Sequence, residues 1–227
     1  MTHTLHRMGN RDNLAGDFAV LAMSAKGINE TGSHVAMRRF MELAFALDPV
    51  NAGDMKTGNM FTHTRQEILD AIQDVSIVHA VFTDEAKVAA LLAEVREADL
   101  GLSVVVSGLF DRVCELSKAA GVRQHTVECS GGVWGRTERL PDTDVMQITT
   151  MCGHGMVAAQ LVERVARQVR HDARRGRQTA KQAALELARP CVCGIFNPVR
   201  AAALLEALAA REAGTSKVTA EPTMVPV

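Results

Sequence analysis

The pattern that most constrains the fold is the alternation of short apolar runs with amphipathic segments in the first 135 residues. Runs rich in apolar and β-branched residues predict strands at 17–23, 75–82, 102–107 and 125–129. Segments with helical spacing between them predict helices at 33–47, 65–73, 84–98 and 111–120. This alternation favours an α/β or α+β layered sheet. A doubly wound sheet and a ferredoxin-like split βαβ both fit the order.

From residue 142 onward the chain reads as helical. Helical spacing predicts helices at 156–171, 180–187 and 198–211, whereas 145–150 is ambiguous. Asn197 and Pro198 are the residue types that begin a helix. We therefore expect a flexible segment at 1–15, a sheet domain at 16–140, a helical region at 141–213 packed on that domain, and a disordered tail at 214–227.

Composition and charge exclude several classes of protein. The net charge of −1 disfavours a nucleic-acid binder, and the absence of Tyr with a single Trp leaves no stacking surface for bases. No apolar run is long enough to span a membrane, and the first residues lack the apolar core of a secretory signal. Five cysteines, an odd number, argue against a disulfide framework. We expect a cytoplasmic protein with reduced thiols.

Three of the cysteines lie in two glycine-containing segments of the helical region. Cys152 lies in MCGHGM, and Cys191 and Cys193 lie in PCVCGI. Because each group precedes a predicted helix, we expect helix N-termini to favour the thiolate, which is the form that binds metals. The glycines should also let backbone N–H groups approach the sulfur atoms.

Three thiolates can hold three corners of a [4Fe–4S] cluster. Such a cluster leaves one iron open, and that iron can act as a Lewis acid on a small polar or anionic substrate. His154 is expected to transfer a proton beside it. This ligand set resembles that of enzymes with an open iron, including dehydratases and desulfidases. The resemblance covers no continuous motif, and it implies a lyase, hydratase or desulfidase type of reaction.

Other interpretations of the same residues stay open. Cys152, His154, Cys191 and Cys193 could form a Cys₃His zinc site in a binding or accessory protein. Cys152 could instead be a nucleophile in an enzyme without a cofactor. The cysteines could also be small buried residues and nothing more. Cys114 is expected in the core.

Polar loops that follow predicted strands are candidates for substrate binding, because ligands of open α/β sheets bind beyond the carboxyl ends of strands. We expect Cys129 to act in catalysis or to contact the substrate. Candidate anchors for an anionic group are Lys26, Asn29, Lys56 and Arg136. The expected partner is a small molecule, with no nucleic acid and no membrane, and the Ala-rich last helix could pair in a homodimer.

Overall fold

The computed structural model describes residues 4–173 and 179–210. A sheet of five strands lies at its centre, in the order β3-β2-β4-β1-β5. Each pair of neighbouring strands is antiparallel. The strands are β1 (Phe18–Met23), β2 (Asn51–Asp54), β3 (Gly58–Asn59), β4 (Ile77–Phe82) and β5 (Ser103–Ser107).

Two interleaved βαβ units account for this strand order. Helix α2 (Ser33–Ala46) connects β1 to β2, and β4 lies between those two strands. Helix α4 (Glu85–Ala98) connects β4 to β5, and β1 lies between them. This is the split βαβ arrangement. Of the two topologies that fit the sequence, the doubly wound sheet is excluded, because it requires parallel neighbouring strands.

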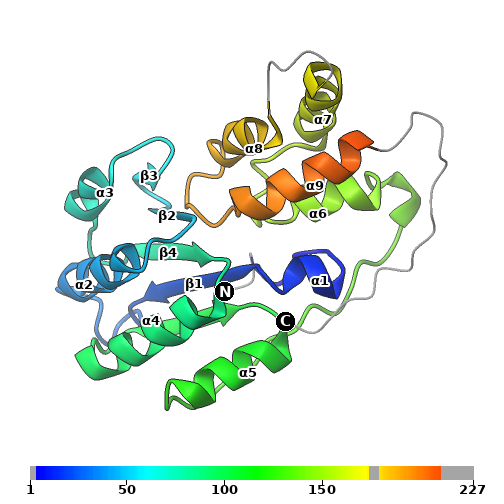
Figure 1. Ribbon diagram of the computed structural model, residues 1–227. Coiled ribbons are helices and arrows are strands. Elements are labelled where there is room, and N and C mark those ends of the chain that lie inside the picture. The colour runs from blue at the N-terminus through cyan, green and yellow to red at the C-terminus, as the bar shows by residue number, and fades with distance from the viewer. Residues whose placement is uncertain (1–3, 174–178, 211–227) are drawn as a thin grey trace.

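Both faces of the sheet are covered by helices. Alternate residues of β1 point to opposite faces. Phe18, Val20 and Ala22 pack in the core that contains α2, α4 and α5 (Phe110–Ala119), whereas Ala19 and Leu21 pack against the C-terminal helices. Figure 1 shows the sheet between these two helical layers. Burial on both sides explains why the apolar run of β1 is continuous rather than alternating.

The C-terminal helices form the second layer. Ile148, Val165, Leu187 and Leu205 are buried there in one cluster with Leu21 of the sheet. The expected mixed α/β class with a helical C-terminal region is confirmed. Within the described residues, no helix is both long and apolar enough to cross a membrane. The helices of this layer are α6 (Thr143–Thr149), α7 (Ala159–Ala173), α8 (Ala180–Ala188) and α9 (Pro198–Ala210).

Local signals in the sequence set several helix ends. The side chain of Asp84 accepts a hydrogen bond from the first turn of α4. Thr179 and Gln182 form a capping box at the start of α8. Asn197 Oδ1 accepts from the backbone N–H of Arg200 at 3.0 Å and so caps α9, as predicted.

The predicted strands and loops differ from the structure at two places. The strand predicted at 125–129 is wrong, because this segment is exposed and pairs with no strand of the described sheet. Conversely, β2 and β3 form between the helices predicted at 33–47 and 65–73, where no strand was predicted. Their Asn, Gly and Asp residues have low strand propensity, and pairing of β2 with β4 outweighs it. Helix α3 (Arg65–Ala71) lies where a helix was predicted, at 65–73.

A flexible segment is expected over 1–15, and several residues of its described part, 4–15, are buried against the rest of the chain. Thr4 and Arg7 are buried, and Ser107 Oγ donates a hydrogen bond to Thr4 Oγ1 at 2.5 Å. A short helix, α1 (Arg11–Leu14), follows. The physical reason is a buried ion pair of Arg7, described below. The tail predicted at 214–227 lies outside the described residues.

Replacing Phe40 by Ala is expected to lower the free energy of unfolding by about 3–5 kcal/mol, because this fully buried ring fills the space between α2 and the sheet. Val35→Ala on the same helix is the control, since Val35 is 65% exposed and its truncation should change the free energy by less than about 0.5 kcal/mol. Urea denaturation followed by circular dichroism measures both. Equal losses would contradict the assigned faces of α2.

Candidate functional site

Three cysteines predicted as ligands lie together in the structure. Cys152 follows α6, and Cys191 and Cys193 lie between α8 and α9. All three side chains are buried. Cys191 is hydrogen-bonded to both Cys152 and Cys193, and His154 Nδ1 lies 3.6 Å from Cys193 Sγ. We call Cys152, Cys191 and Cys193 the three-thiol site.

The cysteines do not lie at helix N-termini, so that part of the prediction is wrong. Helix α7 begins at Ala159, several residues after Cys152. Instead, the backbone N–H of Cys152 bonds to Thr149 O at 3.1 Å and that of Cys191 bonds to Ala188 O at 3.2 Å. Both cysteines therefore lie in turns that follow the ends of α6 and α8, where the helix dipole does not favour a thiolate.

Backbone donors in these turns take the place of the helix dipole. The N–H groups of His154 and Met156 point at the sulfur of Cys152, and the N–H group of Ile195 points at the sulfur of Cys193. In each turn a glycine separates the cysteine from a donor two residues later. The expected N–H···S contacts beside the glycines are thus present in both turns. Such donors stabilise the thiolate form.

Hydrogen bonding within the site divides the thiols into two classes. The bond from Cys191 lowers the pKa of Cys152 to about 6, although burial opposes this shift. The bond from Cys191 likewise lowers the pKa of Cys193 to about 7. The pKa of Cys191 itself is raised, because its proton lies between two thiolates. At neutral pH the site therefore holds anionic sulfur in a buried position.

The β2–β3 hairpin forms the floor of the site. Gly194 adopts a φ of +78°, and a Cβ there would overlap the backbone of Ala52 and Gly53 in β2. Asn59 of β3 donates from Nδ2 to the carbonyl oxygen of Cys191 at 2.9 Å. Only glycine fits this close approach of two backbone segments. The hairpin therefore holds the turn that carries Cys191 and Cys193 against the sheet.

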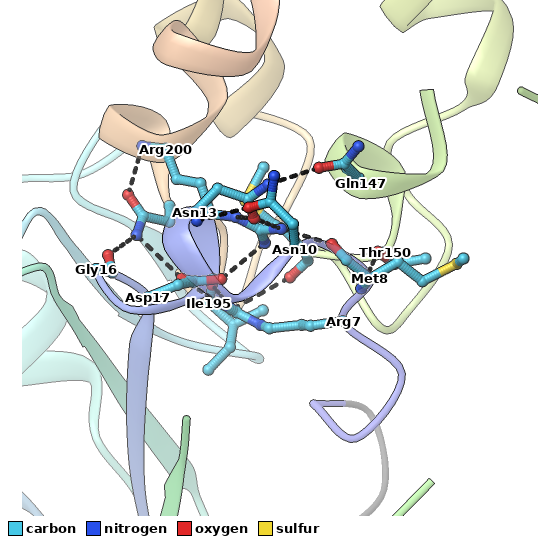
Figure 2. A network of polar contacts seen from close by, with 12 residues as sticks. Arg7, Met8, Asn10, Asn13, Gly16, Asp17, Gln147, Thr150, Ile195 and Arg200 are labelled. Carbon is cyan, nitrogen blue, oxygen red and sulfur yellow. Dashed lines mark hydrogen bonds and ion pairs between the residues drawn. The ribbon is translucent and has the colours of Figure 1, made fainter. Parts of the chain in front are cut away.

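A buried ionic network contacts the two cysteine-bearing turns (Figure 2). Arg7 forms an ion pair with Asp17 and donates to the carbonyl oxygens of Met151, at 3.4 Å, and Ile195. Arg200 pairs with the other carboxylate oxygen of Asp17 at 2.8 Å. The side chains of Arg7, Asp17 and Arg200 are at most 3% exposed. One carboxylate thus joins two guanidinium groups.

Burial raises the pKa of Asp17, but the charges of Arg7 and Arg200 and a hydrogen bond from Asn197 outweigh it, so the pKa is lowered overall. Sequence reasoning missed Arg7, which contacts both turns of the site, and its buried partners Asp17 and Arg200. Arg200 and Asp17 are 183 positions apart, so no spacing connects them. The available signal was a charged residue on the otherwise apolar face of the last helix.

The site lies directly beneath the surface. Residues 153–156 are exposed, whereas Cys152 and Cys193 below them are buried. His154 belongs to this exposed loop and contacts Cys193 from the solvent side. A small molecule that approaches the three-thiol site through this loop therefore meets the imidazole of His154.

Two of the predicted anchors lie at a different end of the sheet. Lys26 and Asn29 follow the end of β1, whereas Asp17 precedes its start. Asn29 accepts from Ala25 N at 2.7 Å and donates to Gly101 O at 2.5 Å, so it holds its own loop in shape.

Lys56, Arg136 and Cys129 are exposed and Cys114 is half-buried, unlike the three buried cysteines of the site. Lys56 is exposed in the turn between β2 and β3. Cys129 and Arg136 lie on the exposed segment between α5 and the 3₁₀ helix η1 (Thr137–Arg139). A 3.1 Å contact between His6 Nδ1 and Ser130 Oγ places that segment beside the N-terminal residues. Cys114, expected in the core, is only half-buried.

Comparisons with protein-family models, with curated proteins and with solved structures find no match to the chain. Among the residues that the structure describes, no group of three or more His, Cys, Asp or Glu side chains has the arrangement of a metal-ion site.

Replacing Gly194 by Ala is expected to lower the free energy of unfolding by about 2–5 kcal/mol, because left-handed strain adds to the overlap with β2. Gly155→Ala is the matched control. Gly155 has a φ of +69°, and an alanine methyl group there would meet nothing within 4 Å, so only the strain of about 1–2 kcal/mol applies. Chemical denaturation measures both variants. Equal losses of free energy of unfolding in the two variants would show that the close approach of β2 to Gly194 adds nothing to the cost of the substitution.

Replacing Cys191 by Ala is expected to raise the pKa of both Cys152 and Cys193, because the shared donor is removed while burial persists. Thiolate ultraviolet absorbance against pH measures the change. The unmodified chain should ionise near pH 6 and pH 7, and the variant at higher pH. Cys114→Ala is the control and should leave these two steps in place. An unchanged curve for Cys191→Ala would refute the role of Cys191 as donor.

Proposed function

We propose that the chain is a metal-dependent enzyme in which Cys152, Cys191 and Cys193 hold a [4Fe–4S] cluster with one open iron. When bound, the cluster would supply a Lewis acid for a lyase, hydratase or desulfidase type of reaction on a small polar or anionic substrate. The observation that carries the proposal is the meeting of three buried thiols from two distant turns, two of them with lowered pKa.

Charge is the first physical support. A buried anion is costly unless a positive partner compensates it. Two thiols whose pKa is lowered to about 6 and about 7, with backbone N–H groups pointing at their sulfur atoms, are suited to a soft cation. N–H···S contacts of this kind also tune iron–sulfur clusters. Cations that displace the proton of Cys191 would release it to solvent, as metal binding to thiols generally does.

The place of His154 supports a reactive rather than a purely structural site. Three thiolates leave one position of a metal centre for a substrate or water. His154 lies at the boundary between the exposed loop 153–156 and Cys193, 3.6 Å from its sulfur. Its imidazole can therefore give or take a proton at a substrate atom that reaches the site. Lys26 and Asn29, at a different end of the sheet, have no part in this proposal.

A second candidate function follows from the contacts between the sulfur atoms. Ligands of a single ion lie close to one another, whereas thiolates on different irons of a cluster stand further apart. Cys191 is hydrogen-bonded to both neighbours, and His154 Nδ1 lies 3.6 Å from Cys193 Sγ, so small side-chain movements from the present arrangement, which is not that of a metal-ion site, would make a set of four ligands. A zinc ion held by Cys₃His would be structural, and the chain would then be a zinc-stabilised binding or accessory protein.

Metal and sulfide analysis of protein purified without oxygen and reconstituted with iron and sulfide tests the two functions. The cluster predicts a brown protein with iron and acid-labile sulfide in equal amounts. Cys193→Ser should lose both, because one of three ligands is removed. Cys129→Ser is the control, since Cys129 is exposed and lies outside the three-thiol site, and it should keep both.

Zinc alone, at one ion per chain and without sulfide, would instead support the second function. Protein that binds neither metal, or binds equally after Cys193→Ser, would overturn the proposal.

A further inference from the structure

One guanidinium group contacts both cysteine-bearing turns. Arg7 donates to the carbonyl oxygen of Met151, the residue directly before Cys152. It also donates to the carbonyl oxygen of Ile195, whose N–H points at the sulfur of Cys193. The two turns are separated in the chain by α7 and α8, and Arg7 bridges them from the side of the sheet.

Arg7 is itself held firmly in place. Its side chain is 3% exposed and pairs with Asp17, which is fixed at the start of β1. The next residue of the segment, Met8, donates its N–H to Thr150 Oγ1 at 3.0 Å, which ties the same segment to the end of α6. Because backbone and side chain are both anchored, Arg7 can set the separation of the two carbonyl oxygens that it binds (Figure 2).

Other direct connections between the turns use the cysteine side chains, and one of them is the contact of His154 Nδ1 with Cys193 Sγ at 3.6 Å. Cys152 and Cys191 are joined by a hydrogen bond that depends on a thiol proton. Metal binding displaces such protons, so this connection is lost when a metal enters. The bridge through Arg7 uses carbonyl oxygens and is unaffected. Arg7 and Arg200 also outnumber Asp17 by one positive charge, which suits anionic sulfur in front of them.

We propose that Arg7 is a positioning residue of the three-thiol site: it holds the turns of Cys152 and Cys193 at the separation that a metal centre requires. The inference rests on the proposed metal-binding function. Arg200 belongs to the same buried network, but its contacts are Asp17, Asn13 and the carbonyl oxygen of Met8. It touches neither turn through these contacts and is therefore the matched control.

Zinc affinity, measured by competition with a chromophoric chelator, tests the inference with the metal alone as the probe. Arg7→Met should lower the affinity by about 10- to 100-fold, the usual effect of removing an outer-shell partner. Arg7→Lys should also lower it, because one ammonium group cannot bridge Asp17 and two carbonyl oxygens as a planar guanidinium does. Arg200→Lys should keep the affinity of the unmodified chain.

The outcomes separate the inference from the proposed function. Equal losses for Arg7→Lys and Arg200→Lys, with zinc still bound by the unmodified chain, would overturn the inference and leave metal binding intact. Circular dichroism confirms that each variant is folded.

If the unmodified chain binds no metal, the proposed function is wrong. A second measurement then tests the role of Arg7 without a metal. Phenylarsine oxide bridges neighbouring thiols, and peptide mass spectrometry identifies an adduct that joins Cys152 to Cys191. Arg7→Met should slow its formation, and Arg200→Lys should not. Equal rates in all variants would show that Arg7 does not set the separation of the turns.

Discussion

The carboxylate of Asp17 is the contact on which the arrangement of the chain depends. It sits at the start of β1 and binds Arg7 of the N-terminal segment, Arg200 of α9 and the side chain of Asn197. Three parts of the molecule, the N-terminal segment, the sheet and the helical layer, therefore meet at one buried charge. Removing one member of a buried ion pair leaves its partner uncompensated and costs about 3–5 kcal/mol.

The chemistry of the three-thiol site follows from this arrangement. The β2–β3 hairpin holds the turn of Cys191 and Cys193 through the hydrogen bond from Asn59 to the carbonyl oxygen of Cys191. Arg7 donates hydrogen bonds to a backbone carbonyl oxygen of each cysteine-bearing turn. The sulfur atoms face the exposed loop that carries His154. Arg7 and Arg200 carry one positive charge more than Asp17 neutralises, and positive charge near sulfur favours the thiolate that attacks a substrate or binds a metal.

Local patterns in the sequence were enough to predict β1, β4, β5 and most of the helices, because each has an apolar face and clear end signals. They were not enough for β2, whose Asn-Ala-Gly-Asp sequence becomes a strand only by pairing with β4. The strand predicted at 125–129 failed for the opposite reason, since its residues are exposed. The three cysteines were grouped because they precede two predicted helices, whereas in the structure they lie in turns that follow α6 and α8. Arg7 was not predicted, because its contact with Ile195 spans 188 positions.

That separation has a consequence for how the protein is made. Arg7 is synthesised before Ile195, and the sheet and most of the helices lie between them in the chain. Contacts of such long range form late in folding, because a large loop must close first. Cys191 and Cys193 are close to each other as soon as both are synthesised, because they are near in the chain. Cys152 comes close to them only when the chain folds. A cofactor that needs all three sulfur atoms would therefore bind only after Cys193 has been synthesised and the two turns have come together.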